Sequence, residues 1–169
     1  MHCSDVLADA FGRISEGVDQ VVDGLDADQL AFRPGDGANS IAWLVWHLTR
    51  VQDDHVAAAA GMEQAWTAAG WADQFALPFD ASATGYGQTP DEAAKVRVGS
   101  GATLLAYHHT VHQRTIRYVH GLDDEDLERV VDESWSPPVT LGVRLVSIIA
   151  DDLQHLGQAA YVRGLLGAT

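Results

Sequence analysis

The sequence predicts an all-α protein built as a four-helix bundle. Apolar residues recur at spacings of three and four in four long segments, the pattern of helices that bury one face. Capping residues precede these segments and glycines follow two of them, so their ends can be placed. A longer stretch rich in glycine, proline and aromatic residues separates the second segment from the third and predicts a long crossover connection between them.

The first helical segment starts after Ser4 or Asp5, either of which can cap it. The sequence RPGDG at 33–37 breaks the helical pattern and separates the first helical segment from the second. The apolar positions that carry the first helix are Val6, Leu7, Ala10, Phe11, Ile14, Val18, Val21, Val22 and Leu25.

The second helical segment begins after a cap at Asn39 or Ser40 and runs to about Gly61. The crossover follows from Gly61 to Gly99, and it contains several aromatic residues that can pack it onto the helices. Within it, the sequence TPDE at 89–92 is a helix start, because a cap is followed by proline and by acidic residues.

The third and fourth helical segments follow the crossover. Gly99 and Gly101 predict a break before the third helix, which stops at Gly121. The fourth begins after a loop with Pro137 and Pro138, is capped by Thr140, and covers 141–166.

Composition limits the partners that this chain is expected to have. At 169 residues, 47% hydrophobic and 20% charged, residues 1–169 are expected to form one domain with a full core. The net charge is −14 and the ten Lys and Arg form no cluster, which argues against nucleic acid and anionic membranes as partners.

The single cysteine, Cys3, cannot form an internal disulfide and is expected outside the helices. Because no stretch has the length and apolarity to span a bilayer, we expect a soluble, cytoplasmic protein. An acidic bundle with five tryptophans is also compatible with a homodimer.

Three residues can form a metal site. Asp151 and His155 are four residues apart in the fourth helix, so both project from one face, and His47 can join them from the second helix. Two imidazoles and one carboxylate leave coordination positions open, which is typical of a catalytic rather than a structural metal site.

Other interpretations of these residues remain open. Asp152, three residues before His155 and near the middle of the apolar stripe, can replace Asp151 as the ligand or support His155. His47 can instead be a half-buried histidine bonded to a backbone carbonyl, and an exposed Asp151–His155 pair would contribute only about 0.3–0.5 kcal/mol. A second pair, His108 and His112, is expected on a partly exposed helix surface.

Two runs of sequence bring a family into the interpretation. The run NSIAWLVWHL at 39–48 and the run DDLQHLGQ at 151–158 resemble the two signatures of the DinB-like (YfiT-like) superfamily of metal-binding four-helix bundles. The resemblance implies that the second helix gives one histidine and the fourth a carboxylate and a histidine, which map onto His47, Asp151 and His155. The carboxylate, the Trp-rich second helix and the Gly-Gln pair after the last ligand look most like mycothiol S-transferases and the N-terminal domain of mycothiol-dependent maleylpyruvate isomerase.

This resemblance implies a function in detoxification. A divalent metal, zinc first and nickel, iron or manganese as alternatives, would activate a small-molecule thiol such as mycothiol as a metal-bound thiolate that attacks an electrophile. Trp43 and Trp46 would hold the apolar part of the electrophile. Two other functions remain open: a metal-dependent hydrolase that uses bound hydroxide, and a stress-associated bundle in which the metal only joins two helices.

Overall fold

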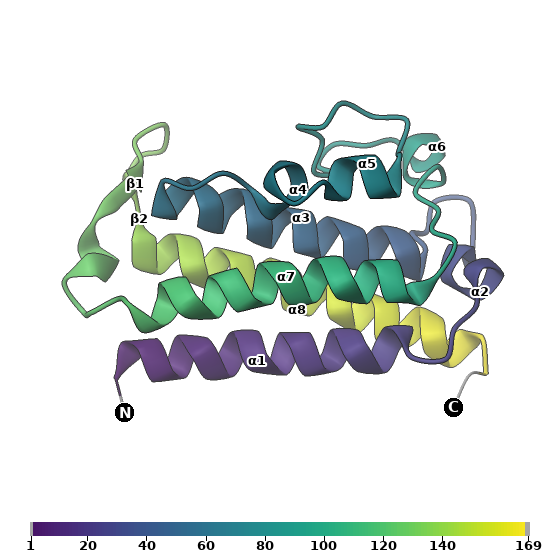
Figure 1. The fold of residues 1–169 in the computed structure, drawn as a ribbon, viewed down its shortest axis with the longest axis horizontal. Helices are drawn as coiled ribbons and strands as arrows, with labels where there is room; N and C mark the ends of the chain where they lie inside the picture. Colours follow the sequence, from purple (N-terminus) through teal and green to yellow (C-terminus); the bar gives the residue numbers. More distant parts are fainter. Residues whose placement is uncertain (1, 168–169) are drawn as a thin grey trace.

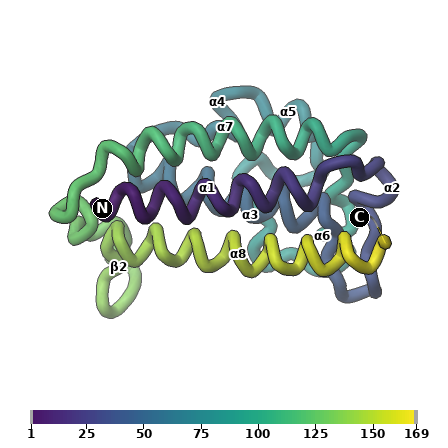
Figure 2. Tube along the Cα trace, turned by 90° about the horizontal axis from the view of Figure 1, so that it is seen from below, coloured from purple at the N-terminus to yellow at the C-terminus, as the bar shows by residue number. Residues whose placement is uncertain are grey.

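The computed structural model describes residues 2–167 and confirms the all-α bundle. Its four long helices are α1 (Cys3–Val22), α3 (Ile41–Ala60), α7 (Gly101–His120) and α8 (Leu141–Leu165). Helices α1 and α3 each pack against both α7 and α8. Helices α1 and α3 therefore lie on one diagonal of the bundle, and α7 and α8 lie on the other (Figures 1 and 2). No helix in residues 2–167 combines the length and the hydropathy that a membrane span requires.

Several of the helix ends lie where the sequence predicts them. The side chain of Ser40 accepts a hydrogen bond from the Trp43 N–H and caps α3, while Thr140 caps α8 in the same way. Gly61 ends α3 with a φ of 64°, a left-handed conformation that glycine adopts without strain. Serine, threonine and glycine therefore set three of the boundaries.

The start of α1 differs from the prediction. The helix begins at Cys3, with His2 as its cap, and the Asp5 carboxylate accepts a hydrogen bond of 2.8 Å from the backbone N–H of His2. The expected cap at Ser4 or Asp5 is therefore wrong, because Asp5 acts from inside the first turn. Cys3 lies within the helix and not before it.

The predicted crossover contains three short helices. These are α4 (Ala65–Ala68), α5 (Trp71–Phe75) and α6 (Pro90–Ala93), and α6 has the predicted cap at Thr89. The chain breaks between α6 and α7 where the two glycines predict it. In Figure 1 the crossover covers the side of the bundle formed by α3 and α7, and α4 contacts both of these helices.

Four short elements outside the crossover were not predicted. A helix α2 (Ala27–Ala31) follows α1, and a single 3-10 turn (Asp126–Glu128) precedes β1 (Val130–Asp132). Strand β1 pairs antiparallel with β2 (Val139–Thr140), so the loop with the two prolines is a hairpin next to the start of α8 (Figure 1). Elements of two to five residues are too short to show a period in sequence.

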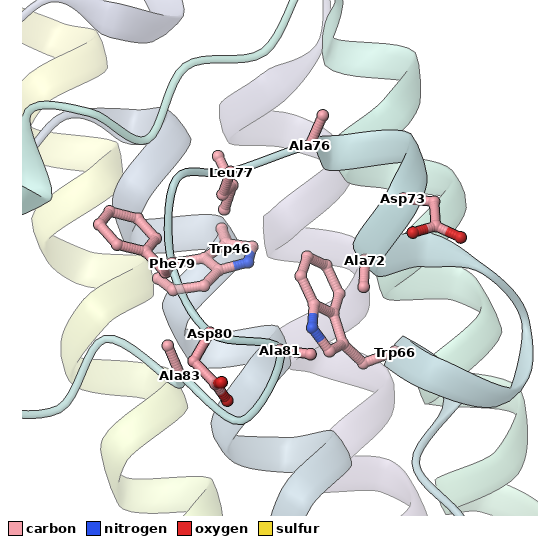
Figure 3. A pocket seen from close by; sticks show the side chains of 10 residues that line it. All are labelled: Trp46, Trp66, Ala72, Asp73, Ala76, Leu77, Phe79, Asp80, Ala81 and Ala83. Atoms are coloured by element: carbon pink, nitrogen blue, oxygen red, sulfur yellow. The ribbon is translucent and has the colours of Figure 1, made fainter.

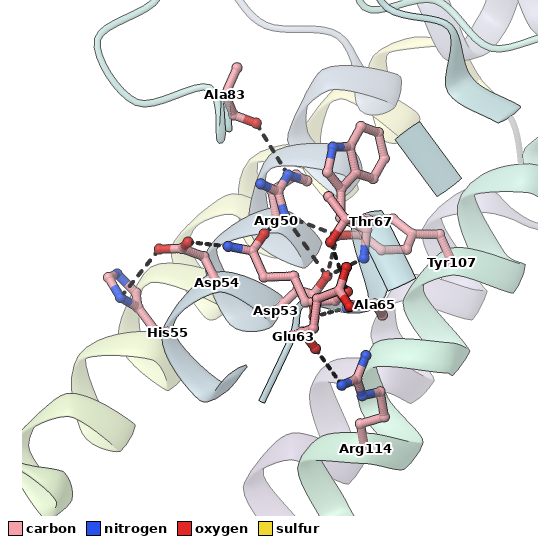
Figure 4. A network of polar contacts seen from close by, with 12 residues as sticks. Arg50, Asp53, Asp54, His55, Glu63, Ala65, Thr67, Ala83, Tyr107 and Arg114 are labelled. Atoms are coloured by element: carbon pink, nitrogen blue, oxygen red, sulfur yellow. Dashed lines mark hydrogen bonds and ion pairs between the residues drawn. The ribbon is translucent and has the colours of Figure 1, made fainter. Parts of the chain in front are cut away.

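A buried polar network holds the crossover against α3 (Figure 4). Arg50, which has no exposed side-chain surface, donates to the carbonyl oxygen of Ala83 at 3.1 Å and to Gln64 Oε1 at 2.7 Å. Its guanidinium lies 5.0 Å from the ring centroid of Trp66 and 3.8 Å from the carboxylate of Asp53. The buried charge is therefore paired with Asp53 and hydrogen-bonded through Nε and Nη1, which offsets its removal from water.

Asp53 fixes the other end of this network. Its two carboxylate oxygens accept hydrogen bonds of 2.8 Å from the backbone N–H groups of Ala65 and Trp66, at the start of α4. The hydroxyl of Tyr107 on α7 donates to the same carboxylate at 3.1 Å. The network thus joins α3, α7 and the crossover through groups buried from water.

Candidate metal centre

The structure brings His47 of α3 together with Asp151 and His155 of α8. One potential ligand atom from each residue lies within 4.8 Å of the other two. Within residues 2–167 these are the only three His, Cys, Asp or Glu side chains that meet in this way. His47 is about a hundred residues from Asp151 and His155 in sequence, and the packing of α3 against α8 brings them together.

His47 is oriented by the crossover. Its Nδ1 lies 2.5 Å from the carbonyl oxygen of Thr84, which can only accept, so Nδ1 carries the proton and Nε2 has the free lone pair. The ring stacks on Trp43 with a centroid distance of 4.5 Å and an angle of 18°. Burial lowers the pKa of His47 below its usual value, which keeps the imidazole neutral, as a metal ligand must be.

The close approach of Thr84 depends on the next residue, Gly85. A Cβ atom at Gly85 would lie 2.7 Å from Nδ1 of His47 and 3.2 Å from the ring of Trp43, and the backbone φ is +97°. Gln88 fastens the same loop, because its Oε1 accepts a hydrogen bond of 2.8 Å from Trp43 Nε1. Residues 84–88 thus cover His47 and set the direction of its ring.

Asp151 and His155 form the other side of the centre. Nε2 of His155 lies 3.6 Å from Oδ1 of Asp151, and this contact with His155 lowers the pKa of Asp151, so the carboxylate is ionised at neutral pH. Oδ2 of Asp151 is buried and has no hydrogen-bond partner among the described residues. On its other edge, Nδ1 of His155 faces Oε1 of Gln158 at 3.4 Å, a long contact for a hydrogen bond.

The donor set fits a divalent metal ion. It consists of two imidazoles, each with Nδ1 turned to an oxygen acceptor, and one ionised carboxylate with an unpartnered buried oxygen. Zinc, iron, nickel and manganese all accept nitrogen and oxygen ligands of this kind. Hydrogen bonds on the far nitrogen of a ligating histidine are also the usual way in which proteins orient such a ligand.

Asp152 does not join the three residues. Its side chain has no exposed surface, and neither of its carboxylate oxygens has a hydrogen-bond partner in residues 2–167. Burial, and then the charge of Asp151, raise the pKa of Asp152 well above its usual value, which favours its protonated, uncharged form. The structure therefore places Asp151, and not Asp152, beside the two histidines.

The second histidine pair is not on an exposed surface. His108 is fully buried, so the prediction of partial exposure is wrong for it, whereas His112 is half-buried. The Thr49 hydroxyl donates to the carbonyl oxygen of Val45 and lies 3.0 Å from Nδ1 of His108, which must then donate to it. Burial lowers the pKa of His108 to about 3. This histidine is a neutral core residue that joins α7 to α3.

A cleft of about 460 Å³ opens beside the centre and is bounded by both His47 and Asp151. His55 also lines it, and its Nδ1 lies 3.8 Å from the carboxylate of Asp54. Two exposed aromatic side chains, Tyr86 from the crossover and Trp135 from the hairpin, complete the walls. Sequence reasoning missed both of them, since they lie in irregular segments without a periodic pattern.

The two tryptophans that were expected to hold a substrate do not line this cleft. Trp43 is buried and supports the His47 ring from behind. Trp46 is also buried, and it lines a separate cavity of about 360 Å³ together with Trp66 and Phe79, under the crossover (Figure 3). Neither residue lines the cleft, which corrects the expectation that they hold a substrate.

Comparisons with known proteins agree with this arrangement. The family model of the DinB superfamily matches residues 10–159. A conserved protein from Enterococcus faecalis, known from its crystal structure, is similar over 100% of this chain and 99% of its own, with 31% sequence identity and a TM-score of 0.93. No curated protein matches this chain.

Proposed function

We propose that this chain, which belongs to the DinB superfamily, is a metal-dependent thiol S-transferase with His47, Asp151 and His155 as its metal ligands. The observation that carries the proposal is the set of free donor atoms. Two imidazoles whose Nδ1 atoms face oxygen acceptors meet the Asp151 carboxylate, with one potential ligand atom from each residue within 4.8 Å of the others, and His47 and Asp151 line a cleft. Three ligands leave positions open for a reactant.

Each of the three side chains has a defined part in this function. The Thr84 carbonyl holds the His47 ring so that Nε2 is free, and Gln158 does the same for His155 through a weaker contact. Asp151 supplies one negative charge, which offsets part of the charge of a divalent ion. Such an ion, when bound, removes the proton from a coordinated thiol that would otherwise ionise only above neutral pH.

The overall reaction joins a thiol to an electrophilic carbon. A carbon–sulfur bond forms, the bond to a leaving group such as chloride breaks, and the thiol proton passes to water. The proposed thiol is mycothiol, for which the support is the resemblance of the two sequence runs at 39–48 and 151–158 to mycothiol-dependent proteins. Zinc is the proposed ion because the reaction requires no change of oxidation state.

The first test is the metal content of the protein. Protein purified without a tag and without added metal should carry one divalent ion, measured by inductively coupled plasma mass spectrometry. His155→Ala should carry almost none, whereas the control His120→Ala, an exposed histidine at the end of α7, should retain it. Equal metal contents in the two variants would contradict the assignment of the ligands.

The second test is turnover. The loaded protein should conjugate mycothiol to monochlorobimane, and a chelator should abolish the catalysed rate. Hydrolysis of esters without any thiol would instead support the hydrolase. A metal that raises the melting temperature without any turnover would support a non-catalytic bundle.

A further inference from the structure

We propose that the cleft lined by Tyr86, Trp135 and Asp54 selects flat, neutral or cationic aromatic electrophiles and excludes anionic ones. The inference rests on the proposed function, because it names the substrate class of the same site. It is carried by the shape of the cleft and by the sign of the charges that line it.

The walls of the cleft are aromatic and exposed. Trp135 keeps 66% of its surface exposed and Tyr86 keeps 93%, although both are large side chains that a protein usually covers. They come from two separate segments, the hairpin and the crossover, yet both border this cleft. Its base includes Val51 and the buried Ile148. Two aromatic faces above an apolar base favour a flat apolar ligand.

The length of the cleft suits a single aromatic molecule beside the metal centre. His47 and His55 both border it and are eight residues apart on α3, which corresponds to about 12 Å along the helix axis. A neighbouring cavity of about 380 Å³ is also bordered by His55 and Trp135, so the cleft continues past the hairpin. A ring system can therefore lie between the aromatic walls while its reactive carbon faces the candidate ligands.

The charges in the cleft are unfavourable for anions. Asp54 and Asp151 line it, and no Lys or Arg among residues 2–167 does so. His55 also lines the cleft, and burial lowers its pKa, which favours the uncharged imidazole at neutral pH. Arg144 borders only the neighbouring cavity, and its guanidinium is bonded to the carboxylate of Asp132 at 2.7 Å.

A bound divalent ion does not reverse this balance. Asp151 offsets one of its two charges, and a thiol that has lost its proton offsets the other. The carboxylate of Asp54 is then the remaining charge that an electrophile meets. Its position is fixed, because its Oδ1 accepts a hydrogen bond of 2.6 Å from Gln64 Nε2.

The test begins with binding, which requires no turnover. Equilibrium dialysis of the metal-free protein would compare meta-dinitrobenzene, dinitrobenzylamine and dinitrobenzoate, which differ in charge and do not react with thiols. Without metal, the benzoate carboxylate has no ion to coordinate. We expect dinitrobenzoate to bind at least about 10-fold more weakly than the other two, as one unfavourable charge at an effective dielectric constant of 20 predicts.

Two pairs of variants locate the effect. Asp54→Asn should improve dinitrobenzoate binding about 3-fold or more, whereas Asp73→Asn, the same change at an exposed position outside the cleft, should not. Trp135→Ala should weaken dinitrobenzene binding about 3- to 10-fold, the value of one aromatic contact, and Trp135→Phe should restore it. Equal binding of the neutral and anionic compounds, or no effect of Trp135→Ala, would overturn the inference.

An activity measurement separates this inference from the proposed function. Rates with chlorodinitrobenzene and chlorodinitrobenzoate, each divided by its uncatalysed rate with the same thiol, should show at least about 10-fold greater enhancement for the neutral compound. The expected binding pattern without any turnover would support the selectivity of the cleft and contradict the proposed thiol transferase activity. Equal rate enhancement with both compounds would support the transferase activity and contradict the selectivity.

Discussion

We predict that Gly85→Ala weakens metal binding, whereas the control Gly87→Ala does not. Both glycines lie in the same loop, Gly85 buried and Gly87 exposed, and have positive φ angles, +97° and +73°. Alanine at either position bears the backbone strain, roughly 1–3 kcal/mol of folding stability. Only at Gly85 does the new Cβ meet the metal centre, since at Gly87 it would have no atom within 4 Å.

The size of the additional effect follows from the contacts around Gly85. The new Cβ would lie 2.7 Å from Nδ1 of His47 and 3.1 Å from the ring of Trp46. Both rings are buried, and His47 stacks on Trp43, whose ring the new Cβ would also approach to 3.2 Å, so the rings cannot yield. The loop must move outward instead, which breaks the hydrogen bond from Nδ1 to Thr84. Loss of such a bond behind a ligating histidine weakens metal affinity about 10- to 100-fold.

The assay is a zinc titration against a competing chromogenic chelator, beside urea unfolding of the metal-free proteins. We expect the zinc Kd of Gly85→Ala to rise about 10- to 100-fold and that of Gly87→Ala to stay within about 3-fold of the parent. If both variants bound zinc as the parent does, the crossover would not orient His47. If both lost affinity equally, general loosening of the loop would be the cause.

Two further predictions concern stability. The unfolding free energy should fall by up to about 1.4 kcal/mol per pH unit as the pH drops from about 6.5 towards 3, because His108 stays neutral in the fold and binds a proton when unfolded. His108→Gln should reduce this slope and the exposed His120→Gln should not, in urea titrations at several pH values; equal slopes would contradict the argument. Asp53→Ala should cost roughly 3–5 kcal/mol because it leaves Arg50 as an unpaired buried charge, whereas Asp54→Ala, at a half-exposed position, should cost about 1 kcal/mol or less. Similar losses for the two aspartates in urea unfolding would refute the role of Asp53.

The long helices could be predicted from sequence because their signals are local. The apolar period marks a buried face, and residues such as Ser40 and Thr140 form caps with groups only three positions away. The same local geometry places Asp151 and His155 on one side of α8, since a helix returns to the same face after four residues. The proximity of His47 to these two residues does not follow from local geometry, because only the packing of α3 against α8 brings His47 close to them.

The remaining features depend on contacts that no local pattern reveals. The bond between His47 and Thr84 spans 37 positions and ends in an irregular loop, so nothing in either segment indicates it. Trp135 lies in a hairpin whose strands are two and three residues long, too short for a recognisable alternation. Asp152 shows the opposite case: its spacing of three residues from His155 suggested a ligand, but its position near the middle of the apolar stripe leaves it buried and outside the group of three.

Distance and direction at the metal centre have separate structural origins. Packing of α3 against α8 sets how near the three side chains lie, whereas the crossover sets which nitrogen of His47 is free. The crossover is in turn held by Arg50, which binds the carbonyl of Ala83, one residue before Thr84. The buried Arg50–Asp53 pair, which lies within the two turns of α3 that follow His47, thus supports the orientation of His47 through the crossover. Variants that weaken this pair should therefore lower metal affinity as well as stability, while truncations in the aliphatic core at the far end of α1 should lower stability alone.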